Sequence, residues 1–497
     1  MNPPHNPDDI PSFDRVAPVL AGYSRQAIQV LLSVGEEAFE LVVALLVMIM
    51  VEQTYGQRGL GVYAYLTACL FVARYVANFG VARYVEHETA VCEQSARQQE
   101  VVHRGYQAVM IGSLTVGLLL TLTAGFDTVH THVEERALAY LIIALNLPAA
   151  NLNHLKFSIL QGLGQHGRVA RLRMVRYGLV LAGMFVFTRL GVRPSYLVGA
   201  FLLADVCMAR VIGRHVKLLK GWNFLNNPRS VKDTLKQGYA FLFTDNGLDV
   251  LLNMDLFVLG LFVSAWDLGI YAEAAVIVRF FLVVPAGIKP ILRRQYTLLA
   301  SHHEATPLVD LFRRRTVLLF SLHAILALLV LLYFPAVLNL LFETRGEELR
   351  SFKLFAEFVP GLIYYGAFSA QETLYEASGR MQGLKRVTVL VAGANFLLTF
   401  YLVPFAGLTG AAAATMLTML LHFGLFGMDL KVRYHMDKLT YVVAGLAVYL
   451  IYMLLKWLAW GSAINFWLGP LGLMLLFYLS GLFGVGDRAL HRSSVCE

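Results

Sequence analysis

The chain has 497 residues, of which 57% are hydrophobic and only 15% are charged. Soluble globular proteins carry about 25% charged residues, so this composition excludes an ordinary soluble protein and favours a helical membrane protein. The net charge of +8 is spread over short connectors between apolar runs, which indicates membrane orientation and argues against nucleic-acid binding. The four cysteines show no spacing typical of a disulfide framework or a metal site.

Apolar runs of about twenty residues, the length that crosses a bilayer as a helix, follow one another along the chain. They predict an all-α polytopic membrane protein with about 14 transmembrane helices. The expected limits are 28–51, 60–81, 106–126, 137–159, 174–190, 195–213, 237–262, 269–291, 316–342, 354–375, 386–404, 407–428, 439–457 and 464–484.

These helices divide the chain into five parts. An N-terminal tail (1–27) precedes the first six helices (28–213), and a basic linker (214–236) separates them from the next six (237–430). The last helix pair and a short tail occupy 431–497.

Lysine and arginine are distributed unequally between alternate connectors. With the N-terminus placed in the cytoplasm, the inside connectors hold 26 of these cations and the outside connectors hold 8. Cytoplasmic loops of membrane proteins carry such an excess of positive charge. Both termini are therefore expected in the cytoplasm.

A short motif occurs twice in the chain. Leu60-Gly61-Val62-Tyr63 opens the second expected helix, and Leu268-Gly269-Ile270-Tyr271 opens the eighth, 208 residues later. The glycine-containing basic segments 160–173 and 375–388 are likewise six helices apart. The chain is therefore interpreted as two six-helix lobes in the same orientation, followed by a helix pair. Internal repeats of this kind are typical of transporters whose halves move about a central binding site.

Four segments together resemble a known family. They are YGQRGLGVYAYLTACLFVARYVANFG, MDLFVLGLFVSAWDLGIYAEAAVIVRFF, EASGRMQGLKRV and VPFAGLTGAAAAT. Over about 28–430 the chain is similar to the polysaccharide-transporter branch of the multidrug/oligosaccharidyl-lipid/polysaccharide (MOP) exporter superfamily. Members of the Wzx type flip undecaprenyl-pyrophosphate-linked oligosaccharides across the bacterial inner membrane.

The resemblance implies a V-shaped transporter with two lobes around a cationic cavity, working by alternating access. It implies no enzymatic activity and no cofactor, with coupling to H+ or Na+. A lipid-linked oligosaccharide would be the substrate, membrane lipids would surround the protein, and a polysaccharide polymerase and other assembly proteins would be partners. The location would be the bacterial inner membrane, and the pathway would be exopolysaccharide, O-antigen or capsule biosynthesis.

Two arginines, Arg74 and Arg279, lie inside expected helices. A charge at the bilayer centre costs about 2.5–3.5 kcal/mol on insertion scales, so each is expected to face a cavity or a partner. In the aligned repeats they differ by three positions, which places them on one helix face. Because arginine binds phosphate through a bidentate fork, both are substrate-binding candidates, together with Asn78 one turn from Arg74. The alternative is a structural ion pair with an acid such as Glu273 or Glu36.

Acidic side chains occur in the first, seventh and eighth expected helices. The two glutamates of the first helix share one face near its cytoplasmic end, where a structural or gating role is favoured over ion coupling. The aspartates make the seventh helix too polar to face lipid. The candidates for gating or for coupling to H+ or Na+ are Glu36, Glu40, Asp245, Asp249, Asp255 and Glu273.

Other functions stay open at this point. A MATE-type drug exporter or a peptidoglycan-precursor flippase shares the expected architecture, although a cationic cavity disfavours the cationic substrates of the drug exporter. From a different class, a membrane-bound polysaccharide polymerase or ligase usually carries a sizeable outer domain. The longest expected outer connectors, 126–136 and 343–353, are too short to form one.

Overall fold

The computed structural model describes residues 13–91, 95–131, 134–214, 228–239, 241–242, 247–301, 305–341, 348–377 and 381–434. All regular secondary structure in these ranges is helical, which confirms the all-helical expectation for this part of the chain. The expected last helix pair and most of the linker 214–236 lie outside the described residues.

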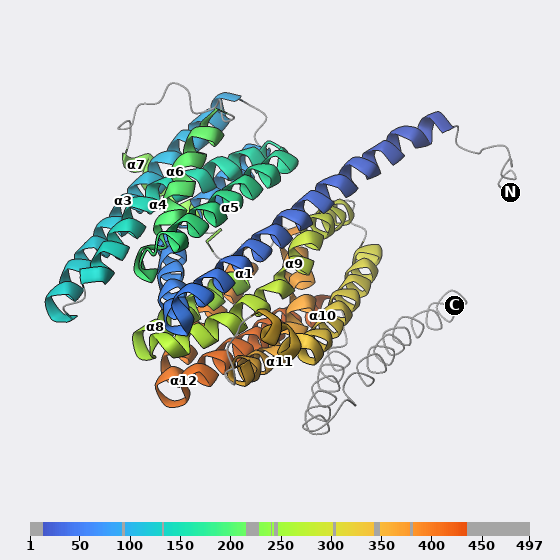
Figure 1. Ribbon diagram of the computed structural model, residues 1–497. Helices are drawn as coiled ribbons and strands as arrows, with labels where there is room; N and C mark the ends of the chain where they lie inside the picture. Colours follow the sequence, from blue (N-terminus) through green and yellow to red (C-terminus); the bar gives the residue numbers. More distant parts are fainter. Residues whose placement is uncertain are drawn as a thin grey trace, which may run out of the picture.

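The helices are long and are joined by short connections (Figure 1). The first part of the chain forms α1 (Phe13–Asn78), α2 (Val81–Val91), α3 (Ser95–Thr131), α4 (Glu134–Gly162), α5 (His166–Arg189), the short 3-10 helix η1 (Pro194–Tyr196), α6 (Gly199–Gly213) and α7 (Pro228–Gly238). The second part forms α8 (Gly247–Phe262), α9 (Ala265–Ser301), α10 (Ala305–Leu341), α11 (Glu348–Ala377) and α12 (Met381–Tyr434).

Helical structure covers the greater part of each of the first twelve expected spans. Two helices each contain a pair of spans and are interrupted by a glycine with positive φ, Gly56 in α1 (φ 68°) and Gly407 in α12 (φ 56°). Glycine adopts this conformation without the steric cost that other residues meet. The expected break after Pro404 is therefore confirmed at Gly407. The helix α1 begins at Phe13, so much of the expected tail 1–27 is helical.

Five helical segments of the described chain are long and apolar enough to cross a membrane. They are Ala96–Thr123, Ala137–Gly162, Pro194–Gly213, Leu308–Leu331 and Arg386–Leu425. Large apolar side chains such as Leu118 and Leu397, which are 61% and 68% exposed, lie on their surfaces. Exposed apolar surface of this kind is what a lipid environment requires, and it indicates a multi-pass membrane protein.

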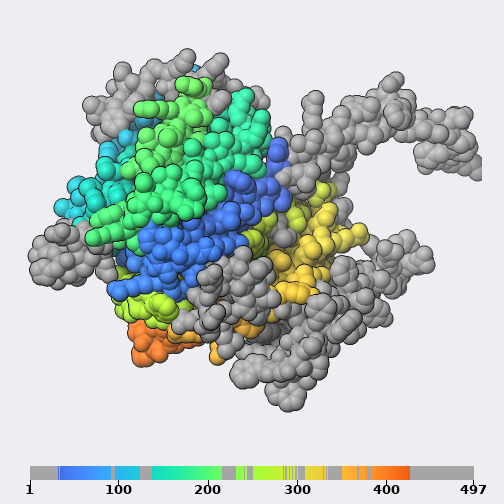
Figure 2. All heavy atoms as spheres, in the orientation of Figure 1, coloured from blue at the N-terminus to red at the C-terminus, as the bar shows by residue number. Residues whose placement is uncertain are grey.

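The long helix α1 lies between two groups of helices (Figures 1 and 2). Helices α2–α7 contact one another on one side, and α8–α12 contact one another on the other. Helix α1 packs along α9 and also contacts α3, α4, α5 and α8. One buried core cluster continues from α1 into α9, α10 and α11. The two groups of helices therefore meet at the seam between α1 and α9.

Candidate functional site

The two copies of the repeated tetrad lie against each other at the seam between α1 and α9. A Cβ atom built on Gly61 would overlap the carbonyl of Ala265 and lie 2.9 Å from the backbone nitrogen of Gly269. A Cβ atom built on Gly269 would overlap the carbonyl of Gln57 and lie 3.2 Å from its Nε2. Only glycine lets two backbones approach this closely. The repeat therefore forms a direct backbone contact between the two groups of helices.

The tyrosines of the two tetrads are both buried, but they have different neighbours. The hydroxyl of Tyr271 donates a hydrogen bond to Asp255 at 2.9 Å. Tyr63 lies within electrostatic range of Arg279 on α9. The first copy of the motif thus brings a phenol from α1 next to the arginine that follows the second copy.

Arg279 lies on α9 and is partly exposed. Its Nη2 donates a hydrogen bond to Oδ1 of Asn253 on α8 at 3.0 Å. The two acids considered as structural partners bond to other groups. Oε2 of Glu273 accepts a hydrogen bond from the Ser351 hydroxyl at 2.6 Å, and Glu36 forms an ion pair with Arg173 of α5. The contacts of Arg279 thus include a hydrogen bond that joins α9 to α8.

Arg74 lies on α1, beside α5 and α6. Its Nε is buried and has no hydrogen-bond partner among the described residues. The ionisable neighbours that act on it are first Arg176 and Asp205, and then Tyr177 and Glu40. The two predicted arginines therefore have different surroundings, Arg74 next to α5 and α6 and Arg279 next to α8.

The two glutamates predicted on α1 both bond to α5. Nη1 of Arg173 donates to Oε1 of Glu36 at 2.8 Å, and the hydroxyl of Tyr177 donates to Glu40. The acids are four residues apart, and so are the donors, so the contact repeats after about one helical turn. These bonds join α1 to α5 along one face.

A buried ion pair on α5 was not foreseen from the sequence. The segment 166–176 has the composition of a cytoplasmic connector, yet α5 begins at His166 and directs Arg176 inward. Arg176 donates from Nε and Nη2 to the two carboxylate oxygens of Asp205 on α6, at 2.6 and 3.1 Å. Asp205 is 0% exposed. The available signal was that Arg173, Arg176 and Tyr177 share one helix face at spacings of three and four.

Asp255 is fully buried on α8 and is surrounded by hydroxyl groups. Its Oδ1 accepts a hydrogen bond from Thr399 at 3.0 Å, and its Oδ2 accepts from Tyr271 at 2.9 Å and from Thr415. Both threonines lie on α12, one on each side of its break at Gly407. The hydrogen-bond partners of this carboxylate within the described chain are neutral groups. A bound proton or small cation would therefore compensate its negative charge.

The remaining predicted residues have structural surroundings or fall outside the description. Nδ2 of Asn78 lies 3.0 Å from Nδ1 of His154, and its Oδ1 accepts from the backbone nitrogen of Ala82 at 3.0 Å. This amide therefore joins α1 to α4 and fixes the start of α2. Asp249 lies within α8, whereas Asp245 lies outside the described residues.

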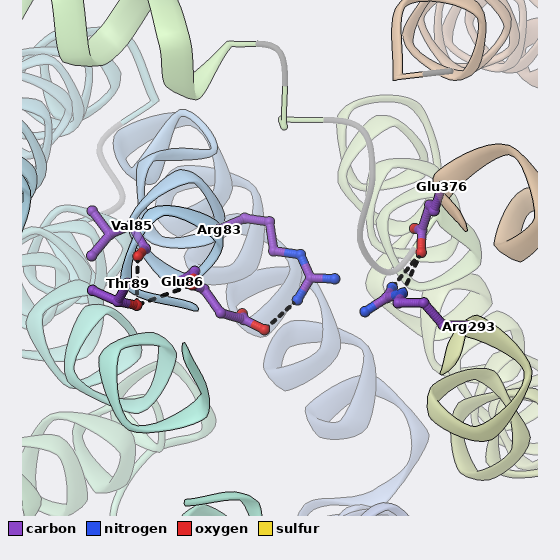
Figure 3. A network of polar contacts seen from close by, with 6 residues as sticks. All are labelled: Arg83, Val85, Glu86, Thr89, Arg293 and Glu376. Carbon is purple, nitrogen blue, oxygen red and sulfur yellow. Dashed lines mark hydrogen bonds and ion pairs between the residues drawn. The ribbon is translucent and has the colours of Figure 1, made fainter. Parts of the chain in front are cut away.

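A second group of ion pairs, also not foreseen, lies further along α9. Nζ of Lys289 pairs with Glu372 of α11 at 2.5 Å, and Nε of Arg293 donates to Glu376 at 2.7 Å (Figure 3). Both cations and both acids are four residues apart, so the pairs join α9 to α11 over one turn. In Figure 3 the side chain of Arg83, on α2, points toward the Arg293–Glu376 pair.

Comparisons with known proteins agree with this architecture. A family model described as polysaccharide biosynthesis protein matches residues 36–291. No curated protein matches the sequence. The lipid II flippase MurJ in an inward closed conformation is similar in structure with a TM-score of 0.67 and 14% identity, over 91% of this chain and 98% of MurJ.

Two further solved structures belong to the MOP superfamily by name. A multidrug resistance MATE transporter in an inward-facing conformation has a TM-score of 0.63 and 15% identity, over 79% of this chain and 95% of that one. A MOP transporter from Pyrococcus furiosus, described as having a binding pocket of reverse polarity, has a TM-score of 0.57 and 14% identity, over 82% of this chain and 96% of that one. The chain therefore has the fold of the MOP transporters and belongs to the polysaccharide biosynthesis protein family.

Proposed function

We propose that the chain is a flippase that moves an undecaprenyl-pyrophosphate-linked oligosaccharide from the cytoplasmic to the outer leaflet of a bacterial inner membrane. Two six-helix lobes, 28–213 and 237–430, would alternate between two arrangements, with 214–236 as their linker and a helix pair within 431–497. The observation that supports this proposal is the backbone contact between Gly61 and Gly269, because it would join equivalent helices of the two proposed lobes at one end.

The orientation expected from the connector charges predicts on which side of the membrane this contact lies. It places both termini in the cytoplasm and Gly61 and Gly269 near the outer ends of their helices. A contact there would close the outer side of the transporter. The opposite ends of the same region carry the ion pairs Arg83–Glu86 and Arg293–Glu376, which would lie on the cytoplasmic side (Figure 3).

The charge of the substrate explains the two arginines in the spans. A pyrophosphate that crosses a medium of low dielectric needs fixed positive charge along its route. Arg279 bonds to a neutral amide, and Arg74 has a buried Nε without a hydrogen-bond partner among the described residues. Both would bind the pyrophosphate through guanidinium hydrogen bonds. Asn78 would hold the end of the helix that carries Arg74 in place.

Coupling to an ion gradient is assigned to Asp255. The surrounding hydroxyls of Tyr271, Thr399 and Thr415 can each rotate to donate to the carboxylate or to offer a lone pair to a cation. A single carboxylate with neutral oxygens suits H+ or Na+, since divalent ions usually take more than one acid. Within the described residues there is no group of three or more His, Cys, Asp or Glu that could hold a metal ion.

The proposal is tested in proteoliposomes that contain a fluorescent polyprenyl-pyrophosphate oligosaccharide. Flipping is measured as the fraction of labelled lipid that becomes protected from a membrane-impermeant quencher. The matched control is the same oligosaccharide on a neutral polyprenol, which should move at least tenfold more slowly because it lacks the charge that the arginines bind. Equal rates for the two lipids would contradict the cationic-cavity mechanism. Efflux of a cationic dye with no lipid flipping would favour a drug exporter instead.

A further inference from the structure

A proline in α9 leaves one backbone carbonyl without its helical partner. In an α-helix the carbonyl of residue i accepts the N–H of residue i+4. Pro285, four residues after Phe281, has no N–H to give. The carbonyl of Phe281 is therefore available to another donor, although Phe281 itself is 0% exposed.

The donor comes from the next helix, α10. Nε2 of His323 lies 3.1 Å from the carbonyl oxygen of Phe281, and Nδ1 of the same ring lies 2.9 Å from the carbonyl oxygen of Leu319. His323 is 0% exposed. Both ring nitrogens therefore face a hydrogen-bond acceptor in a place that water does not reach.

No neutral form of this ring satisfies both contacts. A neutral imidazole carries one N–H and one lone pair, so one nitrogen would direct a lone pair at a carbonyl oxygen. An imidazolium carries two N–H groups and donates to both oxygens. Burial opposes the charge, whereas the two carbonyl dipoles favour it.

We propose that His323 is a proton-binding site that couples protonation to the shape of α9 at Pro285. In the protonated state the ring ties α10 to the free carbonyl of α9. Loss of the proton leaves a lone pair directed at one of the two carbonyl oxygens and weakens the hold of the ring on them. Because α9 carries Gly269 and Arg279, a change in the shape of α9 at Pro285 would be transmitted to the seam with α1 and to the predicted anion site.

The surroundings of the ring keep this site distinct from the charged pairs. From α9 the ring meets Phe281, and from α11 it meets Tyr365 at 6.3 Å between ring centroids and the backbone of Gly366. Tyr365 is the titratable group that faces the ring from these helices in the described chain. Tyr365 in turn lies within electrostatic range of Lys289.

Two ion pairs lie between the region of the ring and the expected cytoplasmic end of α9. Lys289 pairs with Glu372, and one turn further Arg293 pairs with Glu376, where the arginine side chain is 37% exposed. A second buried histidine, His422 on α12, also lies within electrostatic range of Lys289. The ion pairs thus extend from the solvated end of α9 toward Tyr365 and the His323 ring.

The proton site is tested on the full-length protein in lipid bilayers with 15N-labelled histidine. Solid-state NMR distinguishes an imidazolium, with two protonated nitrogens, from a neutral ring with one, and His323→Gln identifies the signal by its loss. We expect the His323 ring to change from imidazolium to neutral between pH 3 and pH 6, because burial disfavours the charged form. A ring that stays neutral, or stays charged, throughout this range overturns the proposal.

Pro285→Ala supplies a second and sharper variant. It returns an N–H to the Phe281 carbonyl, which then competes with the histidine for this acceptor. The midpoint of the His323 titration should fall by about one pH unit, the shift expected when a charged donor loses one acceptor. An unchanged midpoint would show that the free carbonyl does not hold the proton. Asp255→Asn serves as the matched control and should leave the midpoint unchanged.

The link to α9 has its own readout. Spin labels at Gln53 and Trp266, which are both exposed near the glycine contact, report the separation of α1 and α9. Their distance distribution should change across the same pH range in the parent protein and stay constant in His323→Gln. A distribution independent of pH in both proteins would overturn the coupling. The coupling rests on the proposed transport function, but these measurements need no substrate, so a failed flipping assay with an intact His323 titration would count against the flippase alone.

Discussion

Gly61 and Gly269 are 208 residues apart in the chain, yet a Cβ atom on the first would lie only 2.9 Å from the backbone nitrogen of the second. They occupy the same position in the two copies of one tetrad. Equivalent positions of two related units can touch only near the axis that relates them. The contact therefore lies where an axis relating the two predicted lobes would pass.

Enlarging either glycine should open this contact. Gly61→Ala or Gly269→Ala places a methyl group against a backbone carbonyl that cannot rotate away. Overpacking of this kind costs about 1–3 kcal/mol, so the ratio of closed to open contact should fall by roughly tenfold. The spin-label distance between positions 53 and 266 measures the change, and flipping should slow with it.

Two other helical glycines provide the control. A Cβ atom on Gly178 of α5 or Gly393 of α12 meets nothing within 4 Å. Alanine at these positions should leave the distance distribution unchanged and raise stability by about 0.4–1 kcal/mol, because it restricts the unfolded chain. If Gly178→Ala changed the label distance as much as Gly61→Ala does, the contact would have no special role.

Substitutions in the buried pair of Arg176 and Asp205 should have non-additive effects on stability. Removing one partner leaves an uncompensated buried charge, which costs about 3–5 kcal/mol. Arg176→Met and Asp205→Leu should therefore each lower the apparent melting temperature strongly in detergent. The double variant should recover most of the loss, since apolar residues can replace such a pair. Additive losses in the double variant would argue against a direct coupling between the two side chains.

Arg279 should be required for flipping, because its guanidinium is assigned to the pyrophosphate. Arg279→Ala should reduce the initial rate by at least tenfold while the protein still inserts, and Arg279→Lys should retain part of it, since lysine keeps the charge without the planar fork. Arg314→Ala, at an exposed position of α10, controls for the loss of one positive charge. Equal effects of the two alanine variants would remove Arg279 from the site.

The hydroxyl groups that surround Asp255 should determine the response to an ion gradient. Thr415→Val removes an oxygen bonded to this carboxylate, whereas Thr418→Val, on the same helix, removes only a bond to the carbonyl of Ala414. Flipping driven by an imposed H+ or Na+ gradient should weaken in Thr415→Val and in Asp255→Asn. It should persist in Thr418→Val, and a loss there of the same size would indicate general damage to α12.

The membrane orientation is open to a direct test. A reporter active only in the cytoplasm should be active when fused after Gly164, in the connector of α4 and α5, and inactive after Gly191, in the connector that follows α5. The positive-inside distribution is the physical reason. The reverse pattern would place the glycine contact on the cytoplasmic side and invert the proposed direction of closure.

Local features of the fold were predictable because the sequence encodes them locally. Apolar runs fix where helices form in a membrane, and the helices cover most of each of the first twelve expected runs. The break in α12 was predictable because Pro404 and Gly407, two residues that disfavour a continuous helix, stand close together there. The start of α1 at Phe13 was not predictable, because the residues before the first apolar run are polar and rich in proline, as in an irregular tail.

Partnerships between distant residues were not predictable. Asp255 bonds to Thr399 and Thr415, which follow it by 144 and 160 residues, and spacing along one helix says nothing of the neighbouring helix. The same limit explains Arg176, whose segment has the charge pattern of a connector. Internal repetition was the exception, since the repeated tetrad located two segments that proved to be in contact.

The glycine contact also limits how the two copies of the tetrad can diverge. Each glycine is held small by the backbone of the other copy, so a larger side chain in one half cannot be accommodated by any change of side chain in the other half. Most positions in a duplicated chain drift independently once each half has its own neighbours. Two equivalent positions that contact each other share one constraint. This is a physical reason why the short motif can still be recognised in both halves.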